Sequence, residues 1–159
     1  MISRIAKLDH EILVRARDDG ITKRLMTVPG IGAITALAIK SLVHDPDSFK
    51  SARHFAAWIG LTPKSHSSGA SQTLVGISKM GNGQLRTLLV TGAMSVLMHL
   101  KADDKTEPWL SRLKNRRPFK VAAVALANKT ARIVWALLTK GGIYRERRVI
   151  PALVATTSA

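Results

Sequence analysis

Apolar residues recur along most of this chain at the three- and four-residue spacing of amphipathic helices. Residues 2–18 are the first example, because Ile5, Leu8 and Ile12 share one helical face there. Gly20 follows this segment and ends it, and glycine or proline follows several of the later segments in the same way. The pattern therefore predicts an all-α fold, with helices at 2–18, 21–27, 33–43, 49–59, 85–100, 107–114 and 118–139.

The stretch from Pro63 to Gly83 has no helical period and is rich in serine and glycine. Leu74, Val75 and Ile77 favour one short strand within it. A structureless segment of this length is unusual in a compact helical protein, and such segments are often functional. We therefore predict a small irregular or β element here, which we call the serine loop.

Charge changes this picture, because Lys and Arg outnumber Asp and Glu by 25 to 10 and give a net charge of +15. The basic residues also occupy long stretches without any acid, from Ser48 to Ala102 and from Pro108 to Arg145. One-sign stretches on folded segments are typical of a surface that faces phosphates. A nucleic-acid partner is favoured over the alternative, a merely solvated basic surface.

Several other classes of protein are disfavoured. There is no cysteine, which excludes disulfides, a thiolate zinc site and a catalytic thiol. The five histidines have no metal-ligand spacing, so no metal site is predicted. The most apolar stretch, Val121 to Leu138, contains Lys129 and Arg132, whose charges would be costly in lipid, so no membrane segment is predicted.

A glycine-rich turn around Pro29 separates two predicted helices and fits the helix-hairpin-helix pattern. Gly30 and Gly32 permit a tight turn, and the second helix then presents free N–H groups that can bind a phosphate oxygen. Lys23 and Arg24 lie one turn earlier and favour phosphate contact. The alternative is an ordinary corner between two helices.

Two further groups are candidate phosphate contacts. In the serine loop a hydroxyl is either a phosphate contact or a nucleophile, with Lys79 and Arg86 available to neutralise the phosphate; a plain surface loop is the alternative. A basic turn with Arg116, Arg117 and Lys120 precedes the last helix, where the alternative is a solvated run.

The three tryptophans, Trp58, Trp109 and Trp135, fall in predicted helices. Large aromatic side chains in such positions usually bury their rings in the core. Core packing is therefore favoured over base stacking for all three.

Several motifs agree in order and spacing with a known family. They are Val28-Pro29-Gly30-Ile31-Gly32, Phe55 to Pro63, Ser67-Ser68-Gly69, Ile77 to Asn82, and Leu85-Arg86. Over roughly residues 22–140 the chain resembles the C-terminal transposase domain of the IS110 (IS-one-ten) family of insertion sequences. These proteins are relatives of the Piv DNA invertases and include the bridge-RNA-guided recombinases.

The resemblance implies a serine nucleophile. The serine directly before the glycine is the better candidate, which is Ser68 here, with Ser67 in reserve. Its hydroxyl would attack a DNA phosphodiester to leave a covalent phosphoserine and a free hydroxyl end. The transition state carries extra negative charge, for which Lys79 and Arg86 are the candidate cations. The phosphate- or DNA-binding residues expected overall are Gly30, Gly32, Lys23, Arg24, Lys64, Lys79, Arg86, Arg116, Arg117 and Lys120.

The resemblance also sets expectations for domains and cofactors. Full-length members carry an N-terminal RuvC-like domain whose four acidic residues bind magnesium, and nothing in this sequence corresponds to it. We therefore expect no cofactor in this chain and no recombination by this chain alone. The expected divisions are a helical linker at 1–20, the transposase domain at 21–142 and a basic flexible tail at 143–159.

The expected function is DNA transposition by strand cleavage and exchange, in a bacterial cytoplasm and at the nucleoid. DNA is the expected partner, a structured guide RNA is a second candidate, and the active assembly is expected to be a homo-oligomer. The alternative is a non-catalytic basic nucleic-acid-binding module that uses the helix-hairpin-helix, or the remnant of a transposon.

Overall fold

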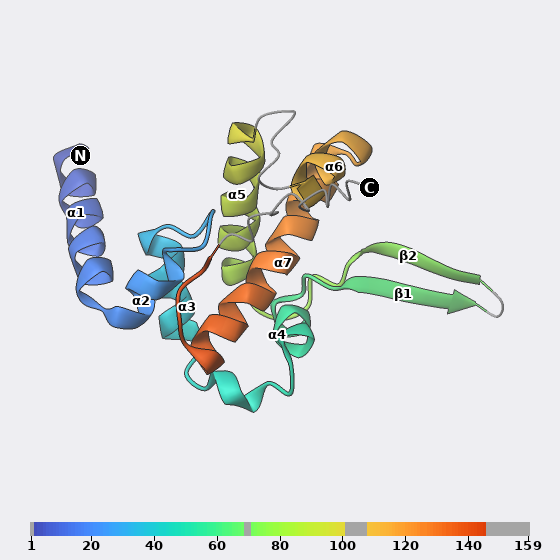
Figure 1. Ribbon diagram of the computed structural model, residues 1–159, viewed down its shortest axis with the longest axis horizontal. Helices are drawn as coiled ribbons and strands as arrows, with labels where there is room; N and C mark the ends of the chain where they lie inside the picture. Colours follow the sequence, from blue (N-terminus) through green and yellow to red (C-terminus); the bar gives the residue numbers. More distant parts are fainter. Residues whose placement is uncertain (1, 69–70, 101–107, 146–159) are drawn as a thin grey trace, which may run out of the picture.

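A computed structural model shows a mainly helical protein, as the hydrophobic pattern predicts (Figure 1). The structure describes residues 2–68, 71–100 and 108–145, and for residues 2–3, 65–68 and 71–75 it describes the backbone alone. The elements are α1 (Ile2–Asp18), α2 (Gly20–Leu25), α3 (Ala33–Leu42), the 3-10 turn η1 (Pro46–Ser48), α4 (Ala52–Ile59), β1 (Pro63–Ser68), β2 (Ser71–Ile77), α5 (Gly83–His99), α6 (Pro108–Arg116) and α7 (Phe119–Lys140).

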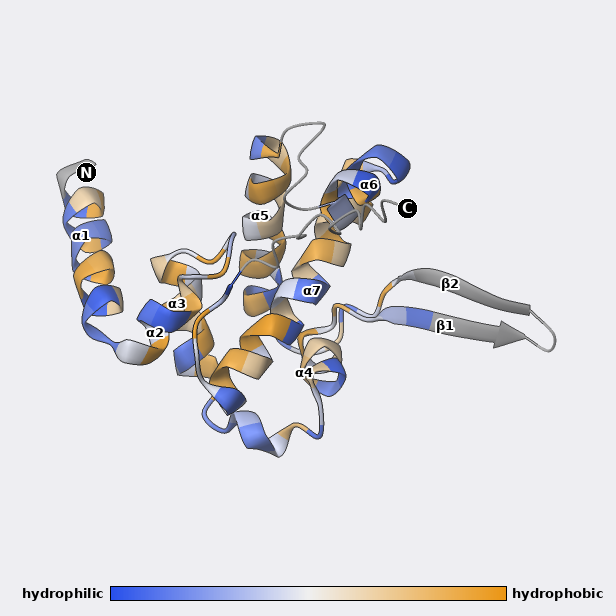
Figure 2. Ribbon diagram, in the orientation of Figure 1, coloured by the Kyte–Doolittle hydropathy of each residue, from blue (hydrophilic) through white to orange (hydrophobic). Residues whose placement is uncertain are grey.

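The core forms where α5 and α7 pack against each other, with α4, α3 and α2 around them (Figure 1). Helix α7 buries four alanines, and small side chains of this kind let neighbouring helices approach closely. Larger side chains from the other helices fill the remaining space. Figure 2 shows the apolar residues concentrated on α5 and α7, whereas α6 is mainly hydrophilic. The largest buried side chains include Leu25, Ile39, Phe55, Leu85, Leu97 and Val134.

Helix α7 is the one helix among the described residues that is long and apolar enough to cross a membrane. Length and composition are weak support for a span, because the central helix of a folded core has the same character. Thr130, Val134 and Leu137 are buried, and α7 packs against α4, α5 and α6. Its apolar residues therefore serve the core described above.

Most helix boundaries agree with the prediction to within about two residues, but α4 begins three residues later than expected. Pro46 starts a 3-10 turn and Phe49 is extended, so the helix begins only after Ser51, whose hydroxyl caps it by accepting from the His54 N–H. The indole Nε1 of Trp135 donates to the Pro46 carbonyl over 3.0 Å and fixes this connection to α7.

The serine loop is a two-stranded antiparallel hairpin, which we call the serine ribbon (β1 and β2). It projects from the helical body in Figure 1. The sequence therefore predicted too few strand residues. Strand β2 is longer than Leu74–Ile77, and β1 was not predicted at all. The sequence of β1 is almost entirely polar, and its backbone pairs with β2 from Pro63 to Ser68.

Helix α1 lies at the other end of the molecule from the serine ribbon (Figure 1). Ala16 is its one buried residue among those whose side chains are described, while Ile5 and Leu8 are more than half exposed. The basic tail predicted from residue 143 falls mainly on residues 146–159, which lie outside the described residues. Of the part that is described, the Tyr144 N–H donates to the Thr27 hydroxyl.

Candidate nucleic-acid interface

The turn between α2 and α3 spans Met26–Gly32 and is tied to the core. Val28 and Ile31 are buried, so the turn is anchored by two side chains. Gly30 has φ +84°, and a Cβ there would lie 2.9 Å from the Gly92 carbonyl oxygen of α5. Glycine is thus required at position 30 by backbone conformation and by close packing on α5, whatever else it does.

Gly32 differs from Gly30 in both respects. It has φ −88°, which any residue can adopt, and no atom lies within 4 Å of the position that a Cβ would take. It is exposed and caps α3 without a side-chain hydrogen bond, so the first-turn N–H groups of α3 keep their donors available. Neither packing nor conformation requires glycine at this position, and the absence of a side chain leaves the N-terminus of α3 open.

Two basic residues that were predicted to accompany this turn lie on α2. Lys23 is exposed, and Arg24 is half-buried. Arg24 faces the C-terminal end of α7, since its Nη1 lies 3.6 Å from the position of a Cβ on Gly141. Positive charge at a helix C-terminus is favourable, so Arg24 stabilises the end of α7. Lys23 is therefore the more available of the two for a phosphate.

The root of the serine ribbon is closely packed. A Cβ on Gly81, which has φ +84°, would lie 1.8 Å from the Trp58 carbonyl oxygen. The Lys79 N–H donates to the Gly60 carbonyl over 3.2 Å, and the Asn128 side chain of α7 donates to the Leu61 carbonyl over 3.0 Å. The root is therefore fixed to both α4 and α7 through backbone atoms.

Arg86 belongs to this root. Its Nη1 donates to the Ile59 carbonyl over 2.9 Å and approaches the Met80 carbonyl at 3.4 Å. The guanidinium thus bridges the residues on both sides of the serine ribbon. Sequence reasoning assigned Arg86 to a phosphate, and in the structure its Nη1 contacts these two backbone carbonyls.

Ser67 and Ser68 lie at the far end of β1, where their backbones pair with Gln72 and Ser71. Ser68 is five residues from Pro63 at the root, which at about 3.3 Å per residue is roughly 17 Å. That length exceeds the reach of a lysine or arginine side chain at the root. The structure therefore does not bring Lys79 or Arg86 to Ser68, and Lys64 lies on β1 beside the root as well.

A third basic group lies where α6 meets α7. Arg116, Arg117 and Lys120 are all exposed there, and Pro118 caps α7 without a side-chain hydrogen bond. Arg116 and Arg117 also line a cleft of about 350 Å³ on α6. The cleft has three further lining residues, Trp109, Arg112 and Leu113, which sequence reasoning did not assign to any site.

The three tryptophans differ in how far they are buried. Trp58 and Trp135 pack against the core, as predicted, whereas Trp109 is 40% exposed. The Nζ of Lys129 lies 4.6 Å from the Trp109 ring centroid in a cation–π contact. The signal that could have found this site is the spacing of Trp109, Arg112 and Arg116, because residues three and four apart share one helix face.

Acidic residues do not gather in the described part of the chain, where no group of three His, Asp or Glu side chains could hold a metal ion. The resemblance places the magnesium site in the N-terminal domain of full-length members, and no chemical step is assigned to a metal held by this chain.

Comparison with known proteins identifies the family. The model of the "Transposase IS116/IS110/IS902 family" matches residues 22–108, more than half of the chain. The match includes the α2–α3 turn, the serine ribbon and α5. The protein is thus of the transposase class, and this chain belongs to the IS116/IS110/IS902 family.

Individual relatives agree with this assignment. The chain is 46% identical to a "probable family 20 transposase" of Pseudomonas aeruginosa, over 90% of this chain and 43% of the relative. It is 44% identical to the transposase for insertion sequence element IS1111A of Coxiella burnetii, over 89% of this chain and 39% of the relative. A pilin gene-inverting protein of Moraxella lacunata is 28% identical over 90% of this chain and 46% of its own length.

The chain thus spans less than half the length of these relatives. Their names support a role in transposition and DNA recombination for the family to which this chain belongs.

Proposed function

We propose that this chain is the DNA-binding, serine-bearing C-terminal part of a transposase, and that Ser68 is its nucleophile. The observation that carries the proposal is the position of the serine pair at the far end of a ribbon that projects from a basic body. A reactive group on such a projection can enter a DNA groove or a partner protein while the helical body stays outside.

The chemistry proposed is a transesterification. The Ser68 Oγ attacks a phosphorus atom, its proton passes to solvent or a base, and the sugar oxygen leaves as a free hydroxyl after taking up a proton. The product is a phosphoserine ester that preserves the energy of the broken bond. Attack by a second DNA hydroxyl then reverses the step on a new strand and releases the serine.

Cations for the transition state must come from outside the root of the ribbon, because Lys79 and Arg86 lie too far along it from Ser68. We propose that a second protomer or another part of the transposase supplies them. This requirement supports a homo-oligomeric active assembly. The exposed apolar residues of α1, including Ile5 and Leu8, offer one surface for such association.

DNA contact by the body is proposed at the α2–α3 turn, acting as a helix-hairpin-helix. Gly32 is the supporting feature, since it leaves the N-terminus of α3 open to a phosphate oxygen. Lys23 adds charge on the same turn, and Arg116, Arg117 and Lys120 would extend the contact at α7. Magnesium would be held by acids elsewhere in the complete transposase, and a structured guide RNA is a second candidate partner. A protein of this kind would act in the bacterial cytoplasm, at the nucleoid.

The α2–α3 proposal can be tested by duplex binding in fluorescence anisotropy. Gly32→Ala places a methyl group over the open N-terminus and should weaken duplex affinity severalfold. Gly20→Ala is the matched control, because Gly20 also has open space around its Cβ position and starts a helix. Equal affinities for the two variants would contradict phosphate binding at this turn.

The serine proposal is tested by trapping. A complete transposase containing this chain is incubated with a nicked suicide DNA substrate, and the covalent adduct is resolved on a denaturing gel. Ser68→Ala should abolish the adduct, whereas Ser67→Ala should retain it. An adduct that survives Ser68→Ala would contradict the assignment of the nucleophile.

The non-catalytic alternative makes a separate prediction. A basic module or transposon remnant would bind DNA with steep salt dependence and form no adduct even within a complete transposase. Binding without an adduct would therefore favour this second function over strand exchange.

A further inference from the structure

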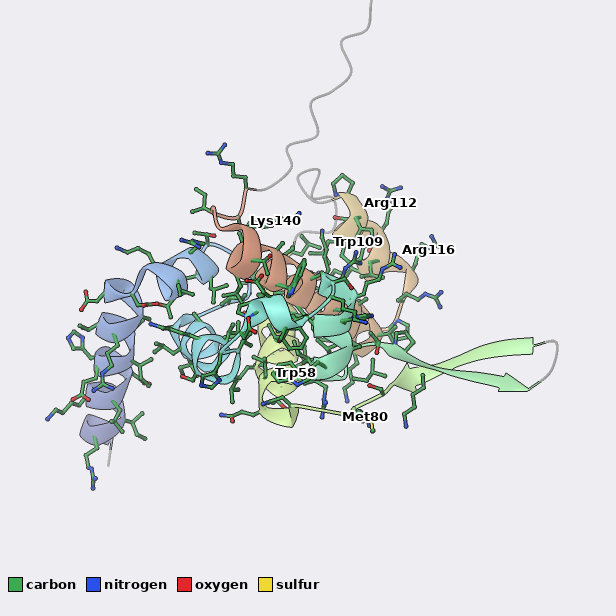
Figure 3. The ribbon with its side chains drawn as sticks, turned by 90° about the horizontal axis from the view of Figure 1, so that it is seen from below. Trp58, Met80, Trp109, Arg112, Arg116 and Lys140 are labelled. Atoms are coloured by element: carbon green, nitrogen blue, oxygen red, sulfur yellow. The ribbon has the colours of Figure 1, made fainter. Side chains whose placement is uncertain are left out.

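The cleft on α6 has a composition that the proposed function does not use. Its lining residues are one tryptophan, one leucine and three arginines, namely Trp109, Leu113, Arg112, Arg116 and Arg117. Figure 3 shows Trp109, Arg112 and Arg116 gathered at α6, away from Lys140 at the far end of α7. The combination of a flat apolar surface and several cations suits a ligand that is itself flat at one end and anionic at the other.

The charges in the cleft are available. The Arg112 Nε donates to the Pro108 carbonyl over 3.1 Å, which holds this side chain along the helix and leaves its Nη donors. Within the described part of the chain, Arg116 and Arg117 make no side-chain hydrogen bond or ion pair. Lys114, on the same helix, differs, because its Nζ donates to the Leu100 carbonyl over 2.8 Å.

The aromatic ring is held in place. Lys129 of α7 lies over the Trp109 ring at 4.6 Å, and the residue still exposes 40% of its surface beside the cleft. A ring clamped on one side by a cation loses little freedom when a second flat group stacks on it. Trp58 and Trp135 cannot act in this way, because both pack against the core.

We propose that this cleft binds one unpaired nucleotide of a nucleic-acid strand, with the base stacked on Trp109 and the flanking phosphates on the arginines. The volume of about 350 Å³ is at the small end of ligand sites, a size that suits a single nucleotide better than a base pair. Base stacking on an exposed aromatic, combined with a basic wall, is a general mode of single-strand binding.

This inference goes beyond the proposed function, because the cleft is on α6 and the serines are at the end of the ribbon. In both Figure 1 and Figure 3, α6 lies on the side of α7 toward the ribbon. The unpaired nucleotide could come from one of two sources. It is either a nucleotide of a DNA duplex whose strands are being separated, or a nucleotide of a single-stranded nucleic acid.

The test uses the full chain and fluorescence anisotropy with four labelled probes. These are a short mixed-sequence DNA strand, the same sequence as RNA, its DNA duplex, and a DNA strand in which every base is replaced by an abasic sugar. Trp109→Leu should weaken binding to single strands about tenfold and change duplex and abasic binding less than about twofold. Trp109→Phe keeps an aromatic face and should retain most of the affinity.

The arginines are tested beside a matched charge. Arg116→Ala should weaken binding to all strands, the abasic strand included, and by more than Lys140→Ala, which removes the same charge at the far end of α7. The DNA and RNA arms then identify which sugar the site prefers. The proposal is overturned if single strands do not bind, if Trp109→Leu leaves their affinity unchanged, or if it weakens all probes equally. None of these results bears on the serine adduct, so the two proposals fail separately.

Discussion

Two elements project from the helical body at opposite ends, the serine ribbon and α1, and they are attached by different physics (Figure 1). The root of the ribbon is held by close backbone packing at Gly60 and Gly81 and by hydrogen bonds from Arg86 and Asn128. Such contacts depend on shape and change little with pH. The direction of the ribbon is accordingly set by the fold.

Helix α1 packs on α2 and α3 with Ala16 buried, and the junction between α1 and α2 also holds polar and ionic contacts. Asp19 caps α2 by accepting from the Thr22 N–H over 2.8 Å and forms an ion pair with Lys40 of α3. The Thr22 hydroxyl donates to the Ala16 carbonyl at the end of α1 over 2.6 Å. The comparison suggests that the ribbon is built to present a group at a fixed position, whereas the α1 joint can respond to solution conditions.

The largest expected effect is at the root. Gly81→Ala drives a methyl group into the Trp58 carbonyl and forces a left-handed backbone on alanine, so the free energy of unfolding should fall by more than about 3 kcal/mol. Gly76→Ala is the control: it also has positive φ, but it lies on β2 with open space around it, and should cost about 1 kcal/mol. Urea unfolding measures both, and equal losses would mean that the root is not closely packed.

Arg86 gives the next effect. Arg86→Met removes charge-assisted hydrogen bonds to the Ile59 and Met80 carbonyls and should lower the free energy of unfolding by about 2 kcal/mol. Lys79→Met removes an equal charge from the same root, where the exposed Lys79 side chain has no partner among the described residues, and should change it by less than about 0.5 kcal/mol. If Arg86→Met were as stable as the wild type, the arginine would be free for phosphate after all.

The α1 joint gives the smallest effect, and it should depend on pH. The hydrogen bond from Lys40 is the main cause that lowers the Asp19 pKa to about 2, and the Thr22 N–H contributes next. A lowered folded pKa means that this stabilisation is present above the ordinary pKa of 3.8 and is lost as pH falls from about 4 through 2.

Two variants separate the parts of this joint. Asp19→Asn keeps a capping side chain and should lose less than about 1 kcal/mol at neutral pH, since the ion pair is partly exposed. Asp19→Ala also removes the cap and should lose about 1 kcal/mol more. Urea unfolding of each at neutral pH and near pH 3 provides the measurement. A difference between wild type and Asp19→Asn that does not shrink at the lower pH would contradict the ionic account.

The helices were predictable because each carries its own apolar period and its own stop, as residues 2–18 and Gly20 do. The ribbon was not, because β1 has no apolar alternation, and its position depends on contacts of Gly81, Arg86 and Asn128 that are distant in sequence. Composition could identify Arg86 as a cation, but only the fold shows that its partners are carbonyls.

The candidate site was predictable in part for the same reason. Ser68 was proposed through the resemblance to the family, because spacing alone does not distinguish a nucleophile from a phosphate contact. The separation between Ser68 and Lys79 exists only once the strands pair. Trp109 was predicted to be buried because helical tryptophans usually are, and the position of α6 at the surface overrides that tendency.

The central claim is that the end of the ribbon carries the nucleophile, and peptide mapping of the DNA adduct tests it most directly. A complete transposase containing this chain is trapped on a suicide substrate, digested with protease and nuclease, and analysed by mass spectrometry. The account predicts a nucleotide remnant on the hydroxyl of Ser68. A remnant on any residue outside the ribbon, or a digest of the trapped complex without a serine-linked nucleotide, would contradict it.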